Sequence, residues 1–245
     1  MPRGGELIAG LDIGTTKICA ILAEVEEEAQ MPRVVGVGVR PSHGGLRRGV
    51  VVNIEQTVQS IKGAVQDAEL MAGEKISSAY VGIAGEHIRG VNSQGVIAVG
   101  RGERQGGEIK KEDVDRVLYA ARAVSIPMDR EILHVLPQEF IVDDQMGIKD
   151  PIGIVGVRLE ARVHIVTASA TFVQNIQESV RRAGLEVREF VLEPLASSYA
   201  VLSDDEKDLG VGLLDVGGGT TDIAIFLGGS LRHTTVIGLG GSHVT

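Results

Sequence analysis

Residues 11–18 read Leu11-Asp12-Ile13-Gly14-Thr15-Thr16-Lys17-Ile18, and residues 214–223 read Leu214-Asp215-Val216-Gly217-Gly218-Gly219-Thr220-Thr221-Asp222-Ile223. Both stretches contain an apolar strand, an aspartate at its end, a turn rich in glycine and threonine, and the start of a second apolar strand. We interpret each as a β-hairpin, with two extra residues in the turn of the later copy. The pair predicts a fold with two related halves.

The composition of the two turns favours phosphate binding. Glycine lets the backbone N–H groups approach an anion closely, and threonine hydroxyls add further donors. An aspartate at a strand end can hold Mg²⁺ through water, because Mg²⁺ keeps much of its hydration shell. Two such turns, one from each half, would hold a triphosphate from both sides.

Other interpretations of the turns are less well supported. A single turn of this kind could be a plain hairpin turn, but two copies at matching strand ends favour the phosphate clamp. The sequence has no P-loop pattern, and both glycine turns lead into strands rather than helices, which also excludes a dinucleotide fingerprint.

The rest of the chain alternates between helices and strands, except in its middle. A helix is predicted between Asn53, a good N-cap, and Gly73, a natural stop. Residues 85–167 read as short strands and one helix, which predicts an inserted α+β subdomain. Within it, 157–165 alternates strictly, so we expect a half-exposed strand with His164 on its exposed face. The charged stretch 203–208 reads as a linker.

Several stretches resemble known proteins. The two turns resemble the phosphate-1 and phosphate-2 motifs of the actin-like ATPase superfamily. Residues 45–51, 69–73, 80–85, 129–140 (DREILHVLPQEF) and 147–151 resemble the FtsA family of bacterial cell-division proteins. The resemblance implies an α/β, actin-like (ribonuclease H-like) ATPase fold with an inserted α+β subdomain of the FtsA 1C (SHS2) type and an incomplete second half.

The resemblance also implies a division of the chain into subdomains. Residues 1–84 and 168–203 would form the first actin-like subdomain (1A), 85–167 the inserted subdomain (1C), and 204–245 the start of the second actin-like subdomain (2A). The family's adenosine-binding motif and its C-terminal membrane helix lie beyond this stretch, so we expect a C-terminally truncated member.

The resemblance assigns roles to individual residues. ATP would be bound by Asp12, Gly14, Thr15, Thr16 and Lys17 in the first turn and by Asp215, Gly217, Gly218, Gly219, Thr220 and Thr221 in the second, with Gly240 and Gly241 as a further glycine turn. Asp12 and Asp215 would hold Mg²⁺. Glu193 resembles the residue that orients the attacking water in heat-shock ATPases. The alternatives are that Glu193 favours its helix dipole and that Gly240 and Gly241 belong to a plain loop.

The function implied by the family is that of a cell-division adaptor. It would bind ATP, self-assemble into actin-like filaments, tether the FtsZ ring to the inner face of the cell membrane, and recruit later divisome proteins through 85–167. It would be at most a slow ATPase. Two alternatives of the same fold remain, an actin-like adaptor of a pilus assembly and a sugar or acetate kinase.

The resemblance implies a cytoplasmic protein, peripheral on the inner face of the cell membrane, and the composition is consistent with the cytoplasm. The 245 residues are 43% hydrophobic, with a net charge of −9 that argues against a nucleic-acid partner. No stretch of 18 apolar residues is present. The single cysteine, Cys19, fits a reducing compartment, and we expect it to be a small buried hydrophobe.

Overall fold

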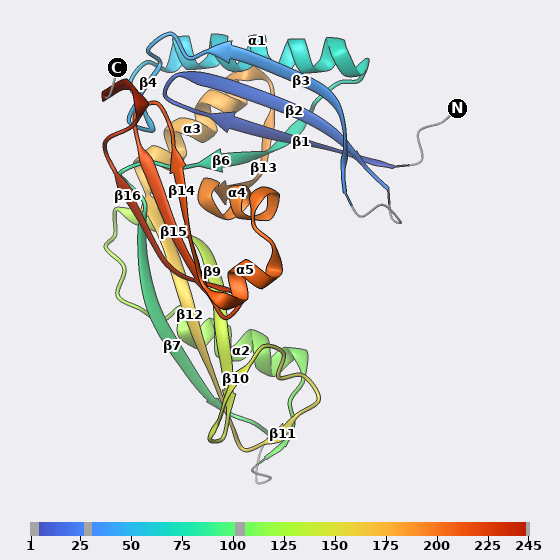
Figure 1. Ribbon diagram of the computed structural model, residues 1–245, viewed down its shortest axis with the longest axis vertical. Coiled ribbons are helices and arrows are strands. Elements are labelled where there is room, and N and C mark those ends of the chain that lie inside the picture. The colour runs from blue at the N-terminus through green and yellow to red at the C-terminus, as the bar shows by residue number, and fades with distance from the viewer. Residues whose placement is uncertain (1–4, 27–30, 101–105, 244–245) are drawn as a thin grey trace.

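The computed structural model describes residues 5–26, 31–100 and 106–243. Its strands form three larger sheets, and two-stranded ribbons join β4 to β5 (Leu46–Arg47 and Val50–Val51) and β8 to β11 (Gly107–Glu108 and Val155–Gly156). Figure 1 shows an elongated molecule with the first sheet at one end and the second sheet extending away from it. Among the described residues, no helix has both the length and the apolar character needed to cross a bilayer.

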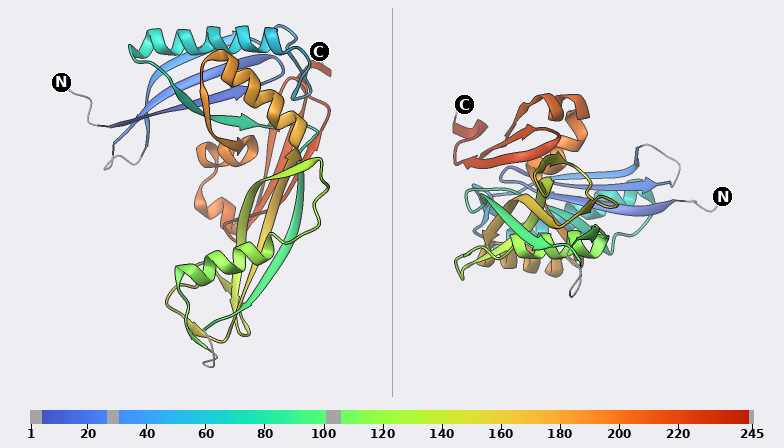
Figure 2. Two further views of the ribbon diagram at one scale, coloured as in Figure 1. Left: turned by 180° about the vertical axis from the view of Figure 1, so that it is seen from behind. Right: turned by 90° about the horizontal axis from the view of Figure 1, so that it is seen from below.

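The first sheet has five strands in the order β13-β6-β1-β2-β3. They are β1 (Glu6–Ile13), β2 (Lys17–Val25), β3 (Arg33–Pro41), β6 (Ser78–Ile83) and β13 (Glu186–Leu192). Strand β2 runs antiparallel to both β1 and β3, whereas β6 is parallel to β1 and β13 is parallel to β6. Helices α1 (Ile54–Ala72) and α3 (Ala170–Ala183) pack side by side on this sheet, as Figure 2 shows from behind.

Helix α1 begins and ends where the sequence predicts. The side-chain oxygen of Asn53 accepts a hydrogen bond from the backbone N–H of Gln56 at 3.1 Å, and Gly73 ends the helix with a left-handed φ of 72°. The helix lies directly on the backbone of β3, since a Cβ at Gly38 would overlap the carbonyl oxygen of Ala64. This close approach buries Ala64 and Ala68 in the main core.

The inserted region forms a sheet of its own. Its antiparallel order is β10-β9-β12-β7, built from β7 (Arg89–Ala98), β9 (Arg130–Val142), β10 (Gln145–Ile148) and β12 (Arg158–Ser169). Helix α2 (Lys111–Ala121) packs against β7 and β12. A second hydrophobic core lies between helix and sheet and includes Val117, Ala121, Leu159 and Val163.

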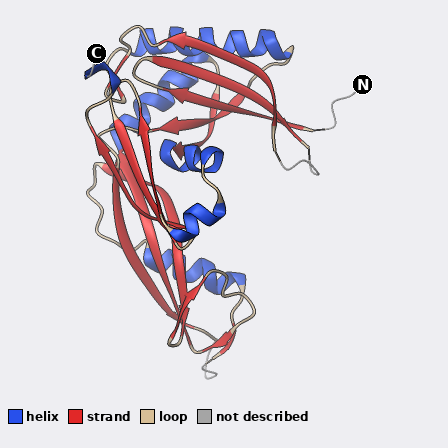
Figure 3. Ribbon diagram, in the orientation of Figure 1, coloured by secondary structure: helices blue, strands red, loops and turns tan. Residues whose placement is uncertain are grey.

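The third sheet lies along the inserted sheet. It contains β14 (Val211–Val216), β15 (Thr221–Leu227) and β16 (Ser230–Ile237) in that order, followed by a short 3₁₀ helix, Gly241–His243. β16 contacts β7, β9 and β12. Figure 3 shows the strands of these two sheets side by side, with α4 (Glu193–Val201) and α5 (Asp204–Leu209) on the opposite side of the third sheet.

The expected linker at 203–208 is a helix. Ser203 caps α5, because its hydroxyl accepts a hydrogen bond from the N–H of Glu206 at 3.3 Å and the Glu206 carboxylate accepts one from the N–H of Ser203 at 2.8 Å. The acidic residues therefore fall in the first helical turn, where the helix dipole favours negative charge. The linker interpretation was wrong because it considered the charges and not their spacing from Ser203.

The expectation of a half-exposed strand at 157–165 is confirmed at Arg158, Glu160 and Arg162, which are exposed or half-buried, and was wrong at His164. Leu159, Ala161, Val163 and Ile165 are fully buried, as the alternation predicts. His164, expected on the exposed face, is only 1% exposed because β16 covers this part of β12. Val157 precedes the strand and is exposed. The alternation of apolar and polar residues identifies the two faces of a strand, but it does not indicate that a second sheet covers part of the polar face.

Candidate functional site

The two glycine turns have the same backbone geometry. The N–H of Gly14 donates to the carbonyl of Lys17 at 3.0 Å, and the N–H of Gly217 donates to that of Thr220 at 2.9 Å. In the first hairpin the last two residues paired across the strands before the turn are Ile13 and Ile18. In the second hairpin they are Val216 and Thr221. The turns are therefore equally long, and the expectation of two extra residues in the second was wrong.

The error came from aligning the two threonine pairs with each other. In the structure Thr15 and Thr16 lie within the first turn, whereas Thr221 already belongs to strand β15. Equal turn lengths place Asp12 opposite Cys19 and Asp215 opposite Asp222. Asp222 is a site residue that the sequence analysis missed, and counting residues across the two hairpins would have found it.

The tips of the two turns touch each other. A Cβ at Gly218 would overlap the side chain of Thr16, and one at Gly219 would lie 3.0 Å from the hydroxyl of Thr15. The same hydroxyl accepts a hydrogen bond from the N–H of Gly49 at 3.2 Å. Backbone from three separate segments thus meets at Thr15.

Gly240 and Gly241 support the second turn from outside. The N–H of Gly241 donates to the carbonyl of Gly217 at 2.9 Å, and a Cβ at Gly240 would lie 2.5 Å from the same oxygen. Thr221 adds a second link between this segment and the hairpin, because its hydroxyl donates to the carbonyl of Leu239 at 2.8 Å.

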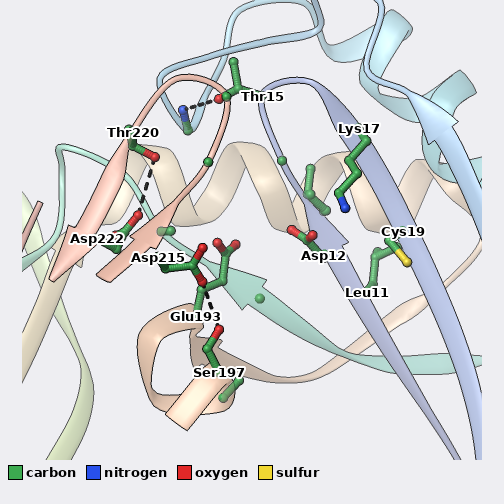
Figure 4. Close-up of a pocket in the computed structure, with 18 of the residues that line it drawn as sticks. Leu11, Asp12, Thr15, Lys17, Cys19, Glu193, Ser197, Asp215, Thr220 and Asp222 are labelled. Atoms are coloured by element: carbon green, nitrogen blue, oxygen red, sulfur yellow. Dashed lines mark hydrogen bonds between the residues drawn. The ribbon is translucent and has the colours of Figure 1, made fainter. Parts of the chain in front are cut away.

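A cavity of about 540 Å³ lies between the two hairpins. Most of the predicted residues line it, namely Asp12, Gly14, Thr15, Thr16, Lys17, Glu193, Asp215, Gly217, Gly218 and Thr220. Gly219, Thr221, Gly240 and Gly241 do not line it. Figure 4 shows the carboxylates of Asp12, Asp215 and Glu193 pointing toward one another, from three different elements.

Helix α4 contributes two groups to the cavity. Glu193 is its first residue and lies over Gly82, where a Cβ would be 3.1 Å from the Glu193 Cγ. One turn later, the hydroxyl of Ser197 donates to a carboxylate oxygen of Asp215 at 2.9 Å. This bond ties the helix to the end of strand β14.

The pKa values of three carboxyl groups in the cavity, those of Asp12, Glu193 and Asp222, are raised above their ordinary values. Burial raises the pKa of Asp12, which Lys17 partly offsets and Asp215 reinforces. Burial, with the charges of Asp12, Asp222 and Asp215, raises the pKa of Glu193 well above its ordinary value. Burial and the charge of Asp215 raise the pKa of Asp222 to about 6. A cation in the cavity would relieve this repulsion.

Asp222 is the most enclosed member of this group. It is 4% exposed. One oxygen, Oδ2, accepts a hydrogen bond from the Thr220 hydroxyl at 3.4 Å, whereas Oδ1 is buried without a hydrogen-bond partner. A buried carboxylate oxygen without a partner costs free energy, so Asp222 weakens the fold at neutral pH.

Cys19 lines the cavity and is only half-buried, so the expectation of a buried hydrophobe was wrong. It occupies the position in the first hairpin that Asp222 occupies in the second. Burial, followed by the charge of Asp12, raises the pKa of its thiol.

Comparisons with known proteins agree with this architecture. A family profile described as "SHS2 domain inserted in FTSA" matches residues 85–167, and one described as "Cell division protein FtsA" matches 212–245. The cell division protein FtsA of Pseudomonas aeruginosa is 53% identical over 99% of this chain. FtsA of Bacillus subtilis is 43% identical over 99%, and FtsA of Escherichia coli K12 is 42% identical over 98%.

The chain spans a little over half the length of these relatives, with 57% of the Pseudomonas, 54% of the Bacillus and 56% of the Escherichia protein covered.

Solved structures share the fold. The "PilM-PilN type IV pilus biogenesis complex" aligns with a TM-score of 0.67 at 20% identity, over 99% of this chain and 64% of that one. The ethanolamine utilization protein EutJ from Carboxydothermus hydrogenoformans aligns with a TM-score of 0.54 at 16% identity, over 99% and 56%. The chain belongs to the FtsA family of cell-division proteins, and its fold is the actin-like ATPase fold with an inserted SHS2 domain.

Proposed function

We propose that the cavity between the two hairpins binds ATP. The observation that carries this proposal is the matched pair of turns, each with an aspartate at its strand end that faces the same cavity. Gly14, Thr15, Thr16 and Lys17 would contact the phosphates from one side, and Gly217, Gly218 and Thr220 from the other. Gly219, Thr221, Gly240 and Gly241 would act indirectly, because they hold the second turn in place.

We propose Mg²⁺ as the accompanying cation, held by Asp12 and Asp215 through water. Carboxylate oxygens are the ligands that Mg²⁺ prefers, and it retains several waters, so two carboxylates are enough. Within the described residues no three ligating side chains come together as a metal site, which fits an ion held largely by water and phosphate. Bound Mg²⁺ would neutralise charge on the phosphate oxygens.

Glu193 is the proposed water-positioning residue of an ATPase that is at most slow. Its carboxylate faces Asp12 and Asp215 in the cavity (Figure 4). Burial and the neighbouring carboxylates raise the pKa of Glu193, so a nearby cation would favour its ionised form. Its position at the start of α4 also favours negative charge through the helix dipole, and this alone could account for a glutamate here.

We propose that the complete protein is a cell-division adaptor. Identity of 42–53% to FtsA proteins supports this role. The adaptor would assemble with itself in an actin-like way and tether the FtsZ ring at the cytoplasmic face of the cell membrane, through a C-terminal helix outside this chain. Its unit 1A would consist of residues 1–84 and 168–203, its unit 1C of 85–167, and its unit 2A would begin with 204–245. Unit 1C would recruit later divisome proteins.

Two experiments test the proposal. Titration calorimetry with Mg-ATP on the protein at the full length of its relatives should give binding that Asp12→Ala and Asp215→Ala weaken. Sedimentation of that protein with FtsZ filaments should carry it into the pellet. A protein that phosphorylates common sugars, or that ignores FtsZ, would point instead to a kinase or to a pilus-type adaptor of the same fold.

A further inference from the structure

A histidine of the inserted sheet is hydrogen-bonded to the edge strand of the main sheet. Strand β13 is an edge strand, so its outward backbone groups have no strand beside them. His134 on β9 fills one of these positions, because its Nε2 accepts a hydrogen bond from the N–H of Leu192 at 3.0 Å. Its neighbours Leu133 and Leu136 pack against the main core, which brings β9 to this edge.

The bonded residue is the last one before the site. Leu192 ends β13 and is the N-cap of α4, and its side chain makes no capping hydrogen bond. Glu193 follows directly as the first residue of that helix. The direction in which α4 leaves the strand therefore determines where the Glu193 carboxyl lies above Gly82 and beside Asp12.

We propose that His134 is a positioning residue, through which the inserted unit sets the orientation of Glu193 in the cavity. The role of Glu193 toward ATP rests on the function proposed above, but the positioning of its carboxyl by His134 does not.

The bond requires neutral imidazole. Because Nε2 accepts, the ring proton of the neutral form resides on Nδ1; protonation of Nε2 would replace the acceptor with a donor facing another donor. The ring lines a pocket of about 480 Å³, which is also lined by Asp115 of α2, by Arg122 at the end of that helix and by Glu189 of β13. Burial lowers the pKa of His134, and the charge of Glu189 opposes this, so the bond is intact at neutral pH and is lost in acid.

Two variants separate the acceptor from the ring. His134→Gln keeps a carbonyl oxygen near the Nε2 position, whereas His134→Phe keeps the planar ring and removes the acceptor. Tyr119→Phe is the matched control, since Tyr119 lines the same pocket and is exposed. Two properties are measured by NMR on the nucleotide-free chain, namely hydrogen exchange of the Leu192 amide and the nuclear Overhauser contact between the Glu193 side chain and Gly82.

In His134→Phe we expect the Leu192 amide to exchange roughly two- to tenfold faster and the contact between the Glu193 side chain and Gly82 to weaken. His134→Gln and Tyr119→Phe should behave as wild type at neutral pH. As the pH is lowered into the acid range below 6.5, the protection of Leu192 should fall in wild type and persist in His134→Gln, which gives a test even where His134→Phe does not fold.

Unchanged exchange in His134→Phe would overturn the proposal. So would faster exchange with an unchanged contact between Glu193 and Gly82, because the bond would then be only structural. Neither measurement uses nucleotide, so a failure of the ATP proposal would show separately, as Mg-ATP affinity that Asp12→Ala leaves unchanged.

Discussion

The imidazole of His164 on β12 lies 2.9 Å, through Nε2, from the hydroxyl of Thr234 on β16, and its Nδ1 lies 2.6 Å from the side-chain oxygen of Asn92 on β7. Gly90 leaves room for this contact, since a Cβ there would lie 2.5 Å from the Thr234 hydroxyl. The contact joins the inserted sheet to the third sheet, whose strand β15 carries Asp222.

Removing the His164 ring should destabilise the protein. In His164→Leu the buried hydroxyl of Thr234 loses its contact with the imidazole, and we expect a loss of about 1–3 kcal/mol in the free energy of unfolding. His233→Leu is the matched control, because His233 lies next to Thr234 on β16 and is exposed. Urea denaturation measures both. Equal stabilities of the two variants would contradict a supporting role for His164.

The same contact predicts a pH dependence. Burial, followed by the charge of His233, lowers the pKa of His164 from 6.5 to about 4. The folded state therefore favours neutral His164, and its contribution to stability is complete above pH 6.5 and is lost as the pH falls toward 4. Urea midpoints between pH 7 and 4 should fall more steeply in wild type than in His164→Leu. Parallel curves would exclude His164 as the cause.

The carboxylates at the strand ends should control nucleotide affinity. Asp12→Ala and Asp215→Ala should each weaken Mg-ATP binding by roughly tenfold or more, because each removes a charge-assisted contact to hydrated Mg²⁺. Asp204→Ala is the control, since Asp204 lies in α5 away from the cavity. Calorimetry on the full-length protein measures all three. Equal affinities across the set would rule out the clamp.

Asp222 should reduce stability at neutral pH. Its raised pKa means that the folded state favours the protonated form, so the destabilisation is absent at low pH and grows as the pH rises through about 6. Asp222→Asn should therefore stabilise the fold by about 1–3 kcal/mol at pH 7 and have little effect near pH 4. Thermal unfolding at both pH values measures this, with exposed Asp144→Asn as the control. A variant that is less stable at pH 7 would contradict the argument.

The packing of α1 on β3 should tolerate no side chain at Gly38. Its Cβ would overlap the carbonyl oxygen of Ala64, and backbone cannot yield as a side chain can. We expect Gly38→Ala to cost about 3 kcal/mol or more. Gly212→Ala, on strand β14 with open space around it, should change the stability by less than about 0.5 kcal/mol. Chemical denaturation distinguishes the two, and a mild effect at Gly38 would mean that the helix can move away.

Features with a local cause could be predicted from the sequence. The two glycine turns and the capped helix α1 follow from residues a few positions apart, and the structure has each of them. The sequence also separated the inserted region from the rest, because hydrophobic periodicity changes at its borders. The roles assigned to the cavity residues stay proposals.

Tertiary structure decided what depends on residues far apart in the chain. The hairpin register made Asp222 the partner of Asp215. The burial of His164 and the hydrogen bond from the Leu192 N–H to His134 both arise where separate sheets meet. Sequence alone determined the local elements and the aspartates at their ends. Only packing decided which polar groups are desolvated and paired, because desolvation depends on all surrounding atoms and not on neighbours in sequence.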